Sequence, residues 1–332
     1  MAFSRRTHLH LFLGLVISAA AVYLSLRKID FQALNAALRS ARYLFILPAM
    51  ILQIGCFFLK GTAWRFLLLP AKKNISPLST TAVLIIGLMV NNLFPAKMGE
   101  LARAYGIGEK EKLPKSLCLS TILVEHLLDI LVLLVFLLIL LPLVSLPAWL
   151  QTTGILLGAV SLGIIGGLFF AMRREQKFQS SLNKLVNYLP GRIQARARSV
   201  IHNVLQGLRV VTGRYILYSF LLLAGMWSLV SLVAYLVMAA FGLFLPIQAA
   251  VMVTVFTAFG KIIPSSPGAI GTFHYLVILV LMSFQVGKEA ALGYAIVLHG
   301  LFFLMEVSLG IVLLLAGNLS LARITRQGEE TT

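Results

Sequence analysis

The amino-acid sequence predicts an all-α polytopic integral membrane protein. Of its 332 residues, 59% are hydrophobic and only 12% are charged, whereas soluble domains carry about 25% charged residues. The mean hydropathy is +0.95, and the apolar residues form runs as long as a membrane helix requires. Because only helices and closed barrels satisfy their backbone hydrogen bonds in a bilayer, and barrel strands are shorter and alternating, these runs favour a helical bundle.

The net charge of +17 fits the same class. Lys and Arg flank the apolar segments, which is the pattern that orients membrane proteins and contacts anionic lipid headgroups. No RNA- or DNA-binding module accompanies the charge. We therefore expect membrane lipids with anionic headgroups as partners, and no nucleic acid. Cys56 and Cys118 both lie in apolar segments and are interpreted as small buried hydrophobes.

The apolar runs divide the chain into spans and two interrupted segments. The first run follows Arg5 and Arg6 and could be a cleaved signal peptide, but the membrane-embedded remainder favours a retained helix. The predicted spans are 9–26, 43–69, 117–143, 149–172, 215–243 and 290–317. Lys60 and Arg65, toward the end of the second span, are interpreted as residues that snorkel to an interface. The interrupted segments are 78–108 and 247–286.

The distribution of basic residues predicts the orientation. The linker 173–214 holds nine of the 28 Lys and Arg residues, whereas the loops 144–148 and 242–246 hold none. Since basic loops stay in the cytoplasm, we expect the linker and both termini to be cytoplasmic in a multi-pass protein of the inner membrane.

A short internal match suggests two inverted repeats within a single membrane domain, 1–332. Residues 93–99 read L-F-P-A-K-M-G and residues 262–268 read I-I-P-S-S-P-G. Each half, about 9–143 and 149–317, then contains two spans, a re-entrant or broken hairpin and one span. The arms of the second hairpin are long enough that two full spans stay open as an alternative. Inverted repeats with broken helices are a transporter architecture.

The first interrupted segment carries candidate binding residues. Lys97, Glu100 and Arg103 recur every three positions, so on a helix they lie along one face. Pro95 lacks a backbone donor and Gly99 relaxes the backbone, so a helix can end and restart here. Such groups at membrane depth are expected to line a protein-walled cavity. The alternative is a cytoplasmic loop followed by an interfacial amphipathic helix.

The second interrupted segment offers a complementary anion site. Ser265, Ser266, Gly268 and Gly271 supply hydroxyls and accessible backbone next to a helix start predicted near Ala269, which is typical of an anion nest. Lys261 flanks this break as Lys97 flanks the first, so together the breaks favour a phosphate. The alternative is that the P-S-S-P-G stretch is only a tight connection between helices.

Ionisable residues also lie inside two predicted spans. Glu125, His126 and Asp129 lie in 117–143, and we expect the two carboxylates to face the interior and to pair with Arg103 or Lys97. The three lack the spacing of zinc-binding helices, so neither a metal nor a cofactor is expected.

Another span carries His299 and Glu306, which are seven residues apart and share a face. A packing role and a proton-carrying role are both open for His299. The complete set of candidate substrate-binding residues is Asn92, Pro95, Lys97, Gly99, Glu100, Arg103, Glu125, Asp129, Lys261, Pro264, Ser265, Ser266, Pro267, Gly268, Gly271, His299 and Glu306.

Three stretches, NNLFPAKMGELARAY, VEHLLDIL and IPSSPGAIGTF, resemble the lysylphosphatidylglycerol synthase transmembrane-region family, also called the flippase-like membrane family. The resemblance covers nearly the whole chain and implies a polytopic inner-membrane protein that translocates lipids. Relatives carry an Arg near the position of His299, so the resemblance assigns that residue no role. By motif match, the signature residues of the family fall on Pro95, Lys97, Gly99, Glu100, Arg103, Asp129, Pro264, Pro267, Gly268 and Gly271.

Two classes of function follow. The first is a flippase that moves an anionic lipid or a lipid-linked intermediate across the membrane. The second is an enzyme, or a membrane subunit that presents a lipid to a separate cytoplasmic lipid- or glycan-modifying enzyme. Larger relatives carry a cytoplasmic aminoacyl-transferase domain that charges phosphatidylglycerol with lysine. The sequence contains neither that domain nor a nucleotide-binding motif, which favours a non-enzymatic role.

Overall fold

The computed structural model is helical wherever it describes the chain. It describes residues 5–94, 97–140, 142–143, 213–261 and 266–316, together with isolated positions between 152 and 198, and none of these lies in a strand. The predicted span 149–172 and the basic linker 173–214 therefore lie largely outside the described residues.

The long helices that it describes follow the predicted spans closely, and their ends differ by at most four residues. In chain order they are α1 (Arg5–Leu26), α2 (Phe31–Ser40), the 3-10 turn η1 (Tyr43–Phe45), α3 (Ile46–Leu68), α4 (Pro77–Leu93), α5 (Met98–Glu111), α6 (Lys115–Leu140), α10 (Gly213–Ala240), α11 (Ile247–Gly260), the 3-10 turn η2 (Pro267–Ala269), α12 (Thr272–Ser283) and α13 (Lys288–Ala316).

Four of these stretches are long and apolar enough to cross a membrane by length and composition. They are Tyr43–Leu68, Lys115–Leu140, Gly213–Ala240 and Lys288–Ala316. Shorter apolar helices lie between them, among them Gly14–Leu26 and Ile247–Gly260. An integral membrane protein with several apolar helices is thus confirmed.

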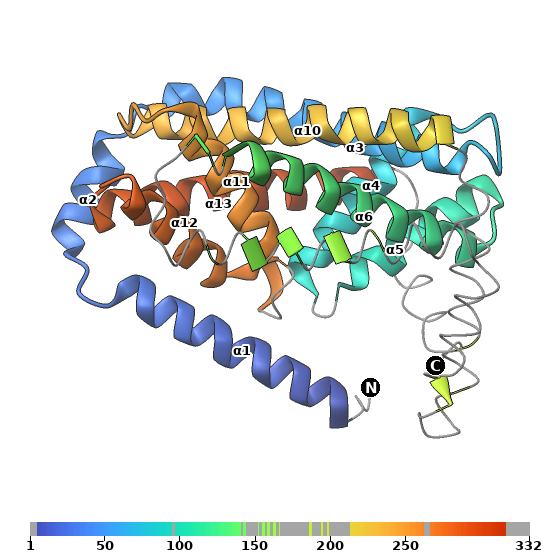
Figure 1. The fold of residues 1–332 in the computed structure, drawn as a ribbon, viewed down its shortest axis with the longest axis horizontal. Helices are drawn as coiled ribbons and strands as arrows, with labels where there is room; N and C mark the ends of the chain where they lie inside the picture. Colours follow the sequence, from blue (N-terminus) through green and yellow to red (C-terminus); the bar gives the residue numbers. More distant parts are fainter. Residues whose placement is uncertain are drawn as a thin grey trace.

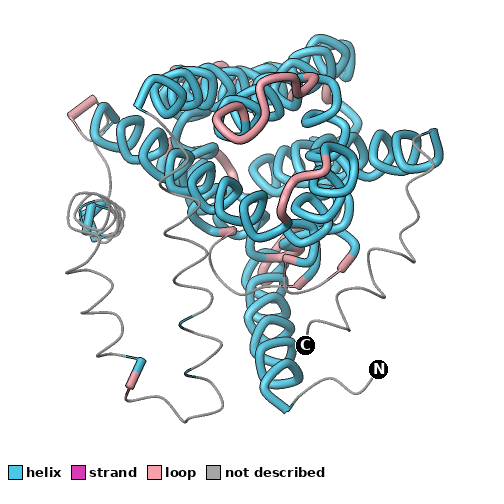
Figure 2. Tube along the Cα trace, turned by 90° about the vertical axis from the view of Figure 1, so that its right-hand side faces the viewer, coloured by secondary structure: helices cyan, strands magenta, loops and turns pink. Residues whose placement is uncertain are grey.

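The long helices pack lengthwise into one bundle (Figure 1). α3 lies beside α10, and α13 packs on both α4 and α12. The largest apolar cluster joins α10, α11, α12 and α13, and a second joins α3, α6 and α10. α1 contacts α12 and extends from one side of the bundle toward the N-terminus, as the end-on view in Figure 2 also shows. Cys56 and Cys118 are buried and free, as predicted.

The two interrupted segments are pairs of shorter helices. α4 packs against α5, and α11 packs against α12. Phe94 is extended after the end of α4, and α5 begins at Met98. At about 1.5 Å per residue, the 14 residues of α5 reach about 21 Å. That is less than the roughly 30 Å hydrocarbon core, so α5 alone does not span a bilayer.

The helix after the second break begins later than expected. We predicted a start near Ala269, whereas α12 begins at Thr272. Gly268, Ala269 and Gly271 have φ angles of 69°, 54° and 92°. Because left-handed residues cannot continue a right-handed helix, the chain reaches helical geometry only beyond them. Gly268 and Gly271 are suited to this bend since glycine adopts positive φ without penalty.

A contact between two glycines closes the α4–α5 hairpin. A Cβ atom built on Gly99 would lie 1.9 Å from the carbonyl oxygen of Gly87 and 2.5 Å from Oδ1 of Asn91. One built on Gly87 would lie 2.3 Å from Cγ of Arg103. The hairpin therefore requires hydrogen at both positions, and this close approach brings Arg103 over α4.

Gly99→Ala is expected to destabilise the protein by about 1–3 kcal/mol, the range for overpacking a well-packed site. Thermal unfolding of the purified protein in detergent measures the change. Gly300→Ala is the matched control, because a Cβ at Gly300 meets nothing within 4 Å and alanine favours a helix interior. Equal unfolding temperatures for the two variants would contradict the close packing.

Candidate functional site: a buried ion network beside two helix breaks

Arg103 of α5 lies at the centre of a buried charge network. Its Nη2 donates to Oε2 of Glu125 at 2.5 Å, and its Nη1 donates to Oε2 of Glu100 at 3.2 Å. The guanidinium also lies 4.4 Å from the ring centroid of Trp64, within cation–π range. The Arg103 side chain is 1% exposed and that of Glu125 is fully buried, so this pair connects α5 to α6 inside the protein.

Lys60 of α3 is the second cation of the network, and its side chain is 15% exposed. Its Nζ lies 2.5 Å from Oδ2 of Asp129 and 3.3 Å from Oε1 of Glu125. The other carboxylate oxygen of Asp129 accepts a hydrogen bond of 2.8 Å from the indole Nε1 of Trp227 in α10. Lys60 therefore bridges both carboxylates of α6, and the network reaches four helices.

Glu100 and Asn91 connect the network to the first helix break. Asn91, near the end of α4, donates from Nδ2 to Oε1 of Glu100 at 3.1 Å. Its Oδ1 accepts from the backbone N–H of Gly99 at 2.8 Å. This side chain thus caps the first turn of α5 from the preceding helix and occupies one of its free amides.

The network contains more carboxylates than cations. Two permanent cations, Lys60 and Arg103, face three carboxylates, Glu100, Glu125 and Asp129. Charges buried this deeply are stable only when they are paired and hydrogen-bonded, and removing one partner leaves another uncompensated. The network therefore fixes α5 against α6 and makes that contact sensitive to any change of charge.

The second break contacts α13 and α4. Nε2 of His299 lies 2.8 Å from the carbonyl oxygen of Gly268. About two helical turns further along α13, Oε2 of Glu306 accepts a hydrogen bond of 2.5 Å from Nδ2 of Asn92. The carbonyl oxygen of Asn92 lies 3.7 Å from the Cβ position of Gly268. The two breaks thus lie against each other, and His299 and Glu306 face them from one side of α13.

The first helix covers the other side of this break. The backbone N–H of Ser266 donates to Oγ of Ser18 in α1 at 2.7 Å. A Cβ at Gly271 would lie 2.6 Å from the Ser18 carbonyl oxygen, and the Gly271 N–H lies 3.4 Å from Nδ1 of His274. Part of the predicted anion nest is therefore occupied by contacts within the protein.

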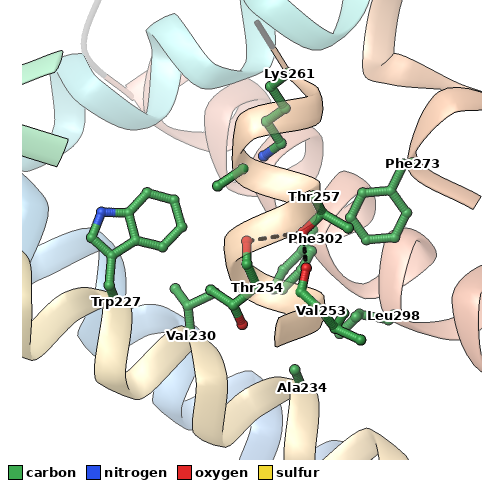
Figure 3. A pocket seen from close by; sticks show the side chains of 11 residues that line it. Trp227, Val230, Ala234, Val253, Thr254, Thr257, Lys261, Phe273, Leu298 and Phe302 are labelled. Carbon is green, nitrogen blue, oxygen red and sulfur yellow. Dashed lines mark hydrogen bonds between the residues drawn. The ribbon is translucent and has the colours of Figure 1, made fainter. Parts of the chain in front are cut away.

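A small cavity of about 30 Å³ lies among α10, α11, α12 and α13. Figure 3 shows Trp227 on one side and the amine of Lys261 pointing toward the interior. Thr254 and Thr257 also line it, and both hydroxyls donate to backbone carbonyls of α11. Such a volume holds water but no lipid headgroup. Since Trp227 also contacts Asp129, the cavity and the ion network share a wall.

The structure brings most of the expected site residues together, but the surroundings of Arg103 and Lys97 differ from those expected. Glu125 and Asp129 are buried as predicted, and Arg103 is the partner of Glu125. We expected Arg103 to line an open cavity, but its position between two carboxylates and an indole ring leaves it 1% exposed. Lys97 is exposed, and in the residues that the structure describes it has no ion pair with either carboxylate. Pro95, Pro264 and Ser265 lie outside the described residues.

Sequence reasoning missed Lys60, Asn91 and Trp227. We interpreted Lys60 as a snorkelling residue, although it lies eight positions before the end of α3 at Leu68. A lysine within one apolar span and carboxylates within another are the signal that could have paired them. Asn91 precedes the break directly, which is a position from which an amide can cap the restarted helix.

The comparison with known families agrees with this architecture. A family model described as "Lysylphosphatidylglycerol synthase TM region" matches residues 11–310. The chain belongs to this family. The match extends from α1 to α13 and so includes both helix breaks and the ion network.

A curated relative is also similar over part of the chain. It is the "UPF0104 membrane protein MJ1595" of Methanocaldococcus jannaschii, which is 30% identical over 124 residues. The matched segment covers 37% of this chain and 35% of the relative, so the chain spans about a third of the relative's length in this match.

Proposed function

We propose that this protein is a lipid flippase that moves an anionic lipid or lipid-linked intermediate across the cytoplasmic membrane. The observation that carries the proposal is the buried network of charged side chains directly beside a helix break, with a second break packed against the first. Intramembrane charges are expensive, and they mark substrate or ion pathways. Broken helices that meet inside a bundle are the usual place for a transporter's binding site.

The inverted-repeat topology belongs to the same proposal. The pairs α4–α5 and α11–α12 are the two hairpins, each preceding a long apolar helix, α6 or α13. With the linker 173–214 and both termini in the cytoplasm, the first hairpin opens inward and the second outward. The shortness of α5 supports re-entry, since it is too short to cross the bilayer alone.

Two lysines supply the charge that attracts the headgroup. Lys97 and Lys261 flank the two breaks and are exposed, with no ion pair to any described carboxylate. Arg103 is already neutralised by Glu100 and Glu125, so its role is to hold α5 in place. As the lipid phosphate passes between the breaks, it would leave the amine of one lysine and bind the amine of the other. The acyl chains of the lipid would stay in the bilayer.

Proteoliposomes carrying a fluorescent phosphatidylglycerol test this function. Externally added dithionite bleaches only outward-facing probes, so translocation is measured as the loss of the protected fraction. Lys97→Gln and Lys261→Gln are each expected to slow translocation about tenfold, because a hydrogen bond to a charged group contributes about 1.5–3 kcal/mol. Lys73→Gln, at an exposed lysine after α3, is the matched control.

The outcome separates the two classes of function. Protein-dependent loss of the protected fraction without a new lipid species supports the flippase. Bleaching equal to that of protein-free vesicles would refute it. The family description names a synthase, so a covalently modified lipid formed after addition of cytoplasmic extract would instead favour a membrane subunit that presents lipid to an enzyme.

A further inference from the structure

His126 of α6 lies between two carboxylates that come from different helices. Its Nε2 is 3.3 Å from Oε1 of Glu100 in α5, and its Nδ1 is 3.8 Å from Oδ2 of Asp129 in α6. The side chain is 41% exposed, in contrast to the buried Arg103 of the network. One edge of the ring is therefore accessible while both nitrogens face acceptors.

This geometry distinguishes the two protonation states of the ring. A neutral imidazole carries one N–H and presents a lone pair at the other nitrogen. With a carboxylate oxygen facing each nitrogen, the neutral ring places that lone pair against a negative charge. The protonated ring donates toward both carboxylates at once, so the site is built for imidazolium.

The charge balance of the surrounding groups points the same way. Without His126, the network holds two cations and three carboxylates, a net charge of −1. A proton on His126 brings the sum to zero. Among the described helices with the most contacts to α6, α3 contributes Lys60, α5 contributes Glu100 and Arg103, α10 contributes the uncharged Trp227, and the nearest charge of α11 is Lys261 at its end.

We propose that His126 is a proton-binding site that controls the docking of α5 on α6 and thereby couples lipid movement to protons. The proton is exchanged at the exposed edge of the ring. When it is bound, Glu100 is attracted to α6 and α5 is docked; when it leaves, the uncompensated negative charge weakens the contact between Glu100 and α6. The docked state is thus favoured at low pH and lost as the pH rises. The coupling part rests on the proposed flippase function, whereas the proton site does not.

Intrinsic fluorescence tests the site independently of transport. The chain has three tryptophans, and two of them contact the network, Trp64 through Arg103 and Trp227 through Asp129. In a Trp149→Phe background, emission of the protein in nanodiscs is expected to titrate in one step between about pH 5 and pH 9, the range of perturbed histidines. His126→Gln should abolish the step, and His274→Gln, at the other end of the site, should preserve it.

Two results would overturn the proton site. They are emission that does not change with pH in the parent, and a step that persists in His126→Gln. Glu100→Gln provides a second variant in case His126→Gln fails to fold. Because it removes one of the two flanking carboxylates, it should move the midpoint to lower pH, and an unmoved midpoint would count against the proposal.

The coupling is measured in the liposome assay with a pH difference across the membrane. Translocation is expected to depend on the direction of the gradient in the parent, and this dependence should disappear in His126→Gln. Translocation that occurs in the parent but ignores the gradient would overturn the coupling while leaving the flippase function intact. Absence of translocation under every gradient would instead refute the flippase function, and the fluorescence result would stand.

Discussion

Arg103→Ala is expected to destabilise the protein by about 3–5 kcal/mol, the cost of removing one partner from a buried ion pair. Glu125 would keep only the 3.3 Å contact with Lys60, and the stacking of the guanidinium on Trp64 would be lost. The variant should be less abundant in the membrane than the parent. Its unfolding temperature in detergent, measured by circular dichroism, should be lower.

The matched variants separate charge from packing at this position. Arg103→Lys keeps the charge but cannot donate to two carboxylates through a planar fork, so it should recover only part of the stability. Arg103→Met combined with Glu125→Gln also removes the charge of the fully buried carboxylate, so that only Glu100 loses its contact with Arg103. This double variant should therefore be more stable than Arg103→Met alone. Stability equal to the parent in Arg103→Ala would show that the network does not hold α5.

The sequence predicted the helices well because each one is defined by local information. Long apolar runs determine α3, α6, α10 and α13, and the Pro and Gly residues at 95–99 and 264–271 predict where helices are interrupted. The late start of α12 was not predicted, since it depends on Ala269 adopting a left-handed conformation. Alanine gives no warning of this, as glycine would.

The pairing of side chains was less predictable than their placement. The interior orientation of Glu125 and Asp129 follows from the cost of exposing carboxylates to lipid. Both carboxylates pair with Lys60 because α3 packs beside α6. No local sequence pattern predicts that packing. Arg103 was expected to line a protein-walled cavity because it shares a helix face with Lys97 and Glu100 beside a helix break. Its burial follows instead from Gly87, which lets the side chain lie directly on α4.

Lys60 lies in the ion network and Lys97 is exposed, so the effects of their substitutions on stability can be compared directly. Lys60→Ala should destabilise the protein by about 3 kcal/mol, because Asp129 loses its cation while remaining buried. Lys97→Ala removes the same number of atoms from an exposed position before α5, and its unfolding temperature should match that of the parent. The measurement is thermal unfolding of both variants in the same detergent.

A third pair of variants identifies the cause of the Lys60 effect. Lys60→Met keeps the apolar stem, so any loss that it shares with Lys60→Ala comes from the missing charge rather than from a cavity. Adding Asp129→Asn to Lys60→Met removes the unpaired carboxylate and should restore part of the stability. If Lys60→Met were as stable as the parent, the contacts of Lys60 would contribute nothing. The two lysines would then be equivalent for folding.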